Sequence, residues 1–133
     1  VLNPAYTMLF QSKAILAHMW ELQPYDPLLL KCSLKEPIGR ENYPFVEKVV
    51  LGREGANVTI FDENGIADIA RTGEYADQIK VYQSLAQLAR DTDGQYYQAG
   101  VFFAYEACGL GFRRSPHRII DNGAQFVGHW VKV

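Results

Sequence analysis

The chain has 133 residues, of which 48% are hydrophobic and 21% are charged, values typical of a globular domain of ordinary size. Thirteen basic and fifteen acidic residues give a net charge of −2, which argues against nucleic acid or an anionic membrane as the main partner. The apolar runs are too short to cross a bilayer and the first residues lack the order of a signal peptide, so a cytoplasmic location is expected.

The first third of the chain has the pattern of helices. Asn3-Pro4 is a helix-start signal, and Ser12 can cap a second helix over residues 13–22, where apolar residues recur at helical spacing. A short third helix is expected after Asp26-Pro27, because Asp followed by Pro is typical of a helix start. Residues 35–44 contain Pro and Gly and are expected to form a connecting loop.

From residue 45 onward the hydrophobic pattern changes to a period of two, which predicts strands separated by turns. The predicted strands cover residues 45–51, 58–61, 66–71, 80–85, 95–105, 109–113 and 126–133. Helices followed by a mostly antiparallel sheet make an α+β fold. The length fits a single domain over residues 1–133.

The most informative local feature is the loop Gly52-Arg53-Glu54-Gly55, which follows Lys48 in the chain. Backbone N–H groups and a guanidinium on such a loop can surround a phosphate, and Lys48 could reach the same anion. The same pattern also fits an ordinary hairpin turn with surface charges. The Walker sequence GxxxxGK[ST] is absent from the chain.

A second cluster of interest is the segment 109–114, with sequence GLGFRR. Strand glycines allow a ligand or another backbone to approach closely, and Arg113 would then face a cleft. A bulged edge strand with solvated arginines fits the pattern equally. The histidines and the two cysteines, Cys32 and Cys108, show no metal-ligand spacing, so free thiols and no metal site are expected in this chain.

Taken in order, these segments resemble the glutathionylspermidine synthase family. The resemblance is carried by residues 3–6, 12–16, 19–22, 27–30, 45–58, 81–85, 109–113 and 120–122. The most specific part is the GREGAN sequence of residues 52–57. The resemblance covers nearly the whole chain and implies part of an ATP-grasp fold. It also implies an ATP-dependent ligase that joins an acid to an amine through an acyl phosphate.

The resemblance further implies which residues bind the nucleotide. Lys13 and Lys48 match lysines that contact ATP in the family. Gln83 and Leu85 fall on the strand whose backbone edge meets adenine.

Two arginines match residues that act on the transferring phosphate. Arg53, between Gly52 and Gly55, matches the arginine of a mobile loop that covers this phosphate, and Arg113 matches the second arginine there. Phosphoryl transfer needs such positive charge on the equatorial oxygens, and glycines let a loop close and exclude water. The chain departs from the family in having Arg114 where a Glu follows the strand arginine, which is expected to add charge near the phosphate site.

The resemblance also implies ligands that this chain cannot bind alone. The family's magnesium ligands and substrate-binding residues come largely from earlier sequence, so Mg²⁺ is expected to be held outside these residues and the chain alone is expected to be inactive. The acid and amine are glutathione and a polyamine in the members that give the family its name. The alternative is a non-catalytic module that binds nucleotide or dimerises, because an uncovered sheet would favour a homodimer.

Overall fold

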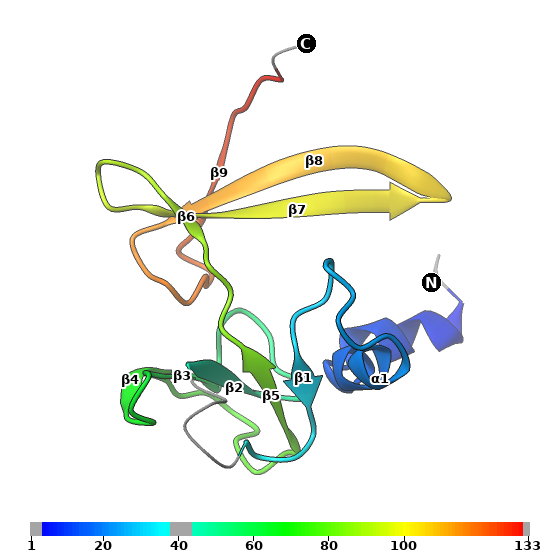
Figure 1. Cartoon of the computed structure of the whole chain (residues 1–133). Helices are drawn as coiled ribbons and strands as arrows, with labels where there is room; N and C mark the ends of the chain where they lie inside the picture. Colours follow the sequence, from blue (N-terminus) through cyan, green and yellow to red (C-terminus); the bar gives the residue numbers. More distant parts are fainter. Residues whose placement is uncertain (1–3, 38–43, 132–133) are drawn as a thin grey trace. The chain divides into compact units, whose positions relative to one another are not determined.

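The computed structural model describes residues 4–37 and 44–131 (Figure 1). Asn3, part of the predicted loop 35–44 and the end of the predicted strand 126–133 therefore lie outside the described residues. The chain divides into two compact units, Val1–Ala86 and Gln87–Val133, and each is described by itself.

The first unit begins with two helical segments. Residues Ala5–Gln11 form a 3₁₀ helix, η1, after Pro4, and Ala14–Leu22 form the α-helix α1. The Ser12 hydroxyl accepts a hydrogen bond from the Ala14 N–H at 3.3 Å, close to the cap that was predicted. The prediction of a third helix after Asp26-Pro27 is wrong. The Asp26 carboxylate accepts a hydrogen bond from the Leu28 N–H at 2.8 Å, and the chain forms a turn here.

Five antiparallel strands follow in the first unit, in the order β1-β5-β2-β3-β4 (Figure 1). Their bounds are β1 (Cys32–Ser33), β2 (Phe45–Val49), β3 (Val58–Phe61), β4 (Ala67–Arg71) and β5 (Lys80–Ser84). Strand β5 thus has β1 on one side and the central strand β2 on the other. Four of these strands match predicted segments, because each alternates apolar and polar residues between turns rich in Gly, Asn and Asp.

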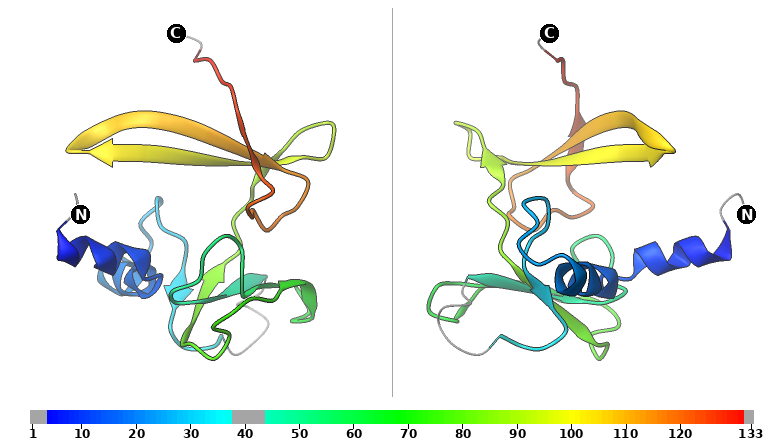
Figure 2. Two further views of the ribbon diagram at one scale, coloured as in Figure 1. Left: turned by 180° about the vertical axis from the view of Figure 1, so that it is seen from behind. Right: turned by 45° about the vertical axis from the view of Figure 1, so that its right-hand side comes forward.

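The core of the first unit lies between α1 and one face of this sheet. Ala17, Cys32 and Val81 are almost fully buried against one another, and Leu16, Trp20 and Val50 pack around them. Both views of Figure 2 show α1 beside the β1 edge of the sheet, where helix and strand make contact.

The opposite face of the sheet carries an aromatic stack. The rings of Phe45 and Phe61 stack with centroids 4.7 Å apart, and Tyr82 meets Phe45 edge-on at 6.0 Å. Alternation along the strands therefore separates an aliphatic face covered by the helix from an aromatic face.

The second unit is a four-stranded antiparallel sheet in the order β6-β7-β8-β9. Its strands are β6 (Ala89–Arg90), β7 (Tyr96–Ala104), β8 (Glu106–Ser115) and β9 (Gln125–Val127). The β7–β8 hairpin turns at Tyr105, which has a φ of 65°. The predicted break before residue 109 is wrong, because the strand passes through Gly109 and the irregularity is a register shift between Phe102 and Phe103 on β7.

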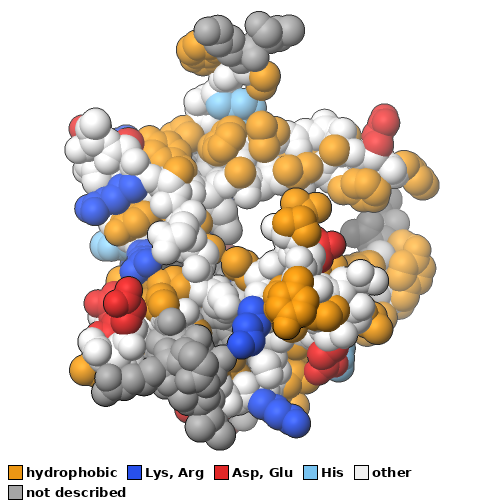
Figure 3. Space-filling view, in the orientation of Figure 1, with side chains coloured by type: hydrophobic (Ala, Val, Ile, Leu, Met, Phe, Trp, Pro, Cys, Tyr) orange, Lys and Arg blue, Asp and Glu red, His pale blue; other side chains and the backbone are white. Residues whose placement is uncertain are grey.

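The hairpin carries exposed hydrophobic side chains near its turn, and hydrophobic atoms are visible on its surface in Figure 3. They include Val101, Phe102, Phe103, Tyr105 and Leu110. The predicted α+β class, with helices first and antiparallel pairing, is confirmed. The strands fall into two sheets where a single sheet was predicted.

Candidate functional site

A hydrogen bond between a lysine and a neutral amide marks the aliphatic face of the first sheet. The strands β2 and β5 pair with Val46 opposite Gln83 and Lys48 opposite Val81, so Lys48 and Gln83 are diagonal neighbours on one face. The Nζ atom of Lys48 donates to Oε1 of Gln83 at 2.8 Å. Gln83 is only 9% exposed, so its side chain holds the ammonium from inside the sheet.

Lys13 joins the start of α1 to the glycine loop. Its backbone N–H donates to the Val50 carbonyl oxygen at 2.9 Å, and its Nζ atom donates to the carbonyl oxygen of Gly52. Two parts of the chain that are 39 residues apart are connected in this way. The structure thus brings Lys13, Lys48, Gly52 and Gln83 into one region.

No acidic side chain in the described part of the chain pairs with either lysine. Burial lowers the pKa of Lys13. Burial also lowers the pKa of Lys48, where the nearby Cys32 thiol acts in the opposite direction and the charge of Lys13 lowers it further. Within residues 4–37 and 44–131, neither lysine forms an ion pair. An anion bound between the two ammonium groups would relieve this repulsion.

The glycine loop has a defined backbone. Glu54, Gly55 and Asn57 have positive φ angles of 57°, 76° and 53°, and the Ala56 N–H donates to the Arg53 carbonyl oxygen at 2.9 Å. Gly52 is required by packing, because a Cβ atom there would lie 2.6 Å from Cγ2 of Val49.

The Arg53 side chain points away from the packed core. It is exposed and makes no hydrogen bond or ion pair with any residue that the structure describes. Its guanidinium is therefore able to contact a ligand.

Neighbouring strands already occupy the backbone of β5 at Gln83, which the sequence had placed beside adenine. Gln83 pairs with Cys32 on one side and Val46 on the other, so a planar base cannot reach its backbone edge. The Leu85 N–H, beyond the end of the strand, is 3.4 Å from the Pro44 carbonyl oxygen. Gln83 contributes its side chain to Lys48, and the Leu85 N–H is hydrogen-bonded to Pro44.

A cavity of about 170 Å³ lies at the end of β5. Its lining includes Phe45, Tyr82, Ser84 and Lys35. Burial raises the pKa of Tyr82. Phe45 and Tyr82 lie on the aromatic face of the sheet, opposite Lys48, whereas Cys32 and Gln83, which also line the cavity, lie on the face of Lys48. The cavity therefore borders the region of the lysines at Gln83.

Arg113 lies in the second unit, on β8, opposite Gln98 on β7 and Phe126 on β9. Its guanidinium carbon is 5.9 Å from the centre of the Phe126 ring, and Nη2 donates to the Asp121 carbonyl oxygen. These contacts fix the direction of the side chain on one face of the second sheet.

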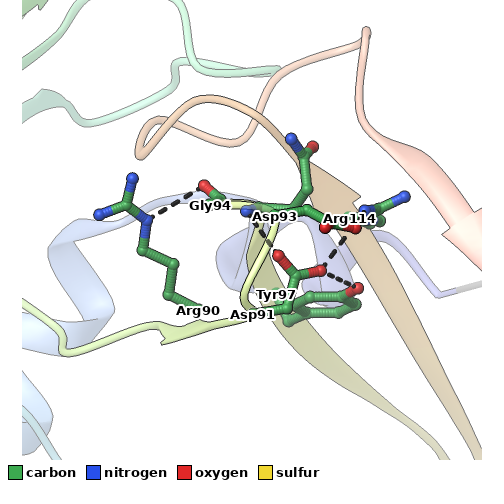
Figure 4. A network of polar contacts seen from close by, with 7 residues as sticks. Arg90, Asp91, Asp93, Gly94, Tyr97 and Arg114 are labelled. Carbon is green, nitrogen blue, oxygen red and sulfur yellow. Dashed lines mark hydrogen bonds and ion pairs between the residues drawn. The ribbon is translucent and has the colours of Figure 1, made fainter.

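Arg114 points to the other face of this sheet, because neighbouring strand residues alternate. Its Nη2 atom is 3.4 Å from Oδ2 of Asp91 and 3.3 Å from Oδ2 of Asp93, and Asp91 also accepts from the Tyr97 hydroxyl at 2.7 Å (Figure 4). The hydrogen bond from the Gln95 N–H lowers the pKa of Asp91 most, and the Tyr97 hydroxyl and the charge of Arg114 lower it further. Two carboxylates therefore accompany the Arg114 charge on the face of the sheet opposite Arg113.

Sequence patterns missed two side chains that hold the glycine loop. Asn57 Nδ2 donates to the Glu74 carbonyl oxygen, and Gln78 Oε1 accepts from the Leu51 N–H at 3.2 Å. Asn57 belongs to the GREGAN sequence, which could have pointed to its role in the loop. Gln78 lies in a connection that has no motif.

Two kinds of feature were not found among the described residues. The described part of the chain has no group of three or more His, Cys, Asp and Glu residues placed to hold a metal ion. None of its described helices is long and apolar enough to span a membrane.

The amino-acid sequence matches a known protein family. Residues 1–132 match the family model described as glutathionylspermidine synthase preATP-grasp. The chain is 32% identical over 136 residues to a Haemophilus influenzae protein named as a candidate acid–amine ligase, covering 97% of this chain and 34% of that protein.

Two further relatives are named synthetases. The chain is 26% identical over 132 residues to trypanothione synthetase of Crithidia fasciculata, covering 98% of this chain and 20% of that protein. It is 28% identical over 102 residues to the bifunctional glutathionylspermidine synthetase/amidase of Escherichia coli, covering 77% and 16%. The chain spans about a third or less of the length of these relatives. With nearly every residue matched by the family model, the chain belongs to the glutathionylspermidine synthase family.

Proposed function

We propose that this chain is the nucleotide-binding part of an ATP-dependent ligase that joins an acid to an amine, with an ATP-grasp type of site. The observation that carries the proposal is the pair Lys13 and Lys48, which are partly buried, have lowered pKa values and have no ion-pair partner among the described residues. A polyphosphate is a ligand that would balance two such cations.

The glycine loop supports the same assignment. In the proposed complex, Lys13 and Lys48 hold phosphate oxygens, and the exposed Arg53 covers the phosphate that is transferred. Gly52 and Gly55 bound the segment that closes, and the site then excludes water that would hydrolyse an acyl phosphate. Arg113 is proposed as a second arginine at the transferring phosphate.

The role of Leu85 in the proposal rests on the family, and that of Gln83 rests on its hydrogen bond. Leu85 would present its backbone to adenine, while Gln83 holds Lys48 in place through its side chain. The described residues do not fit a magnesium site, so any Mg²⁺ that accompanies ATP would be held by residues outside this chain. No step proposed for these residues depends on a metal that they bind.

The substrates are inferred from the relatives. Their names include glutathionylspermidine synthetase and trypanothione synthetase, so a thiol peptide is the acid and a polyamine is the amine to test first. The ligase reaction would transfer the γ-phosphoryl group of ATP to the carboxylate, and the amine would then displace phosphate to form the amide.

The test is an ADP-release screen on the full-length protein, with panels of thiol peptides and polyamines. The proposal predicts ADP release that requires one acid and one amine together, with an amide as product. A protein that binds ATP but releases no ADP with any pair would instead be a non-catalytic nucleotide-binding module.

A further inference from the structure

The connection between β4 and β5, residues 72–79, touches the glycine loop at both of its ends. At the start of the loop, the Leu51 N–H donates to Oε1 of Gln78 at 3.2 Å. At its end, Nδ2 of Asn57 donates to the carbonyl oxygen of Glu74. The two side chains therefore bracket the segment that carries Arg53.

Close packing fixes the same end of the loop. A Cβ atom at Gly73 would lie 2.6 Å from the Cβ atom of Ala56, so the connection passes directly against the loop here. Asn57 has a φ of 53°, a conformation that Asn adopts more readily than most residues. Its side chain can form the hydrogen bond because the backbone turns at this residue.

The Arg53 side chain forms no hydrogen bond with this connection among the described residues, while its carbonyl oxygen accepts from the Ala56 N–H at 2.9 Å within the loop. A hollow of about 580 Å³ separates the loop from the connection, and this hollow is bordered by Arg53, Glu54 and Tyr75. Arg53, Glu54 and Leu51 are exposed, whereas Asn57 is partly buried. Hydrogen bonds therefore hold Leu51 and Asn57, and the hollow leaves space beside Arg53.

From this arrangement we infer that Asn57 and Gln78 are positioning residues for Arg53. They hold the two ends of the loop, so that the exposed Arg53 guanidinium reaches one place when a ligand binds. Without them the loop samples more conformations, and fewer of these present Arg53 correctly. The inference rests on the proposed function for its effect on turnover, but the two hydrogen bonds are tested independently of it.

The kinetic experiment uses four variants of the full-length protein. Asn57→Gly removes the donor and keeps the positive φ without strain, and Gln78→Ala removes the acceptor. Gln78→Glu keeps an acceptor for the Leu51 N–H, and Gln11→Ala changes an exposed glutamine elsewhere in the same unit. Each variant is compared with the unmodified protein for kcat and for KM of ATP in the ADP-release assay.

We expect Asn57→Gly and Gln78→Ala to lower kcat about tenfold, with KM for ATP changed less than about twofold. Gln78→Glu and Gln11→Ala should keep kcat within about twofold of the unmodified protein. An unchanged kcat in Asn57→Gly and Gln78→Ala, or a raised KM with unchanged kcat, would overturn the inference.

Trypsin cleavage after Arg53, followed by mass spectrometry, gives a readout that needs no activity. Cleavage there should be several-fold faster in Asn57→Gly and Gln78→Ala than in Gln78→Glu or Gln11→Ala, because the freed loop fits a protease more easily. If the protein releases no ADP, the proposed function fails while faster cleavage still supports the two hydrogen bonds as restraints on the loop. Equal cleavage rates in all variants would overturn the inference whatever the activity.

Discussion

Lys48 Nζ and Gln83 Oε1 lie 2.8 Å apart across β2 and β5, and Lys48 has no carboxylate partner among the residues that the structure describes. The same two strands hold a contrasting pair on the other face, where Lys80 Nζ lies 2.8 Å from Oε1 of Glu47. The hydrogen bond with Glu47 raises the pKa of Lys80, whereas burial lowers that of Lys48. Lys80 is neutralised within the protein, and Lys48 can balance the charge of a ligand.

Gln83→Glu should turn the Lys48–Gln83 hydrogen bond into an ion pair like that of Lys80 with Glu47. A carboxylate beside Lys48 would raise the pKa of the lysine and would compete with phosphate oxygens for it. We expect ATP to bind about tenfold more weakly to this variant, a loss of about 1.4 kcal/mol. Isothermal titration calorimetry measures the change, and an affinity equal to that of the unmodified protein would show that Lys48 does not meet the phosphates.

Arg53→Ala should affect turnover more than binding. If the guanidinium contacts the phosphoryl group only as it is transferred, kcat of the full-length protein should fall about 10²-fold to 10³-fold. The affinity for ATP should change only a few-fold, because the lysines remain. An equal loss of both quantities would mean that Arg53 simply anchors the nucleotide.

The neighbouring arginines of β8 provide a matched comparison. Arg113→Ala should lower kcat, whereas Arg114→Ala should leave kcat nearly unchanged and lower the melting temperature, because Arg114 bonds Asp91 and Asp93. Steady-state kinetics and thermal unfolding of both variants test this difference. Equal kinetic effects of the two substitutions would contradict the assignment of the two side chains to different faces.

Gly52→Ala should destabilise the fold through a steric clash. The added Cβ atom would lie 2.6 Å from Cγ2 of Val49 and 3.2 Å from the Ala56 carbonyl oxygen. The expected loss in unfolding free energy is about 1–3 kcal/mol, measured by denaturant titration. Gly128→Ala is the control, since no heavy atom lies within 4 Å of its Cβ position, and it should cost much less.

The lowered pKa of Lys48 makes stability depend on pH in a definite direction. Below that pKa the lysine is charged in both the folded and the unfolded chain, so the cost of burying the charge is present in full. As the pH rises from the lowered value toward the usual 10.5, the folded chain loses its proton first and stability increases through this contribution. Thermal unfolding of the unmodified protein and Lys48→Met, compared across this range, should show a smaller rise for the variant. Parallel curves would argue against a buried charge at Lys48.

Local signals predicted the turns of the first sheet well. Asp62 and Gly65 were predicted to form a hairpin turn, and Asp62 Oδ1 accepts from the N–H groups of Asn64 and Ile66, both at 2.8 Å. Asp26 has the same side chain before Pro27, where the sequence favoured a helix. Its carboxylate forms a local bond that competes with helix, and the residues after it contribute no packing that would favour one.

The residues of the site were predictable, but their contacts were not. The resemblance to the family selected Lys13, Lys48 and Gln83 from the sequence, whereas the bond from Lys48 to Gln83 depends on the register of strands 35 residues apart. Strand order also determined that Gln83 is paired on both sides, which no pattern within residues 80–85 contains. Register and order come from packing over the whole unit, so a reading of short segments could not give them.

Calorimetric titration of ATP into the full-length protein at low salt tests most directly whether Lys48 serves a polyphosphate. The unmodified protein should bind ATP, Lys48→Ala should bind about 10-fold to 100-fold more weakly, and Lys80→Ala should bind as the unmodified protein does. Binding that is absent from the unmodified protein, or that Lys48→Ala and Lys80→Ala reduce to the same extent, would contradict the account.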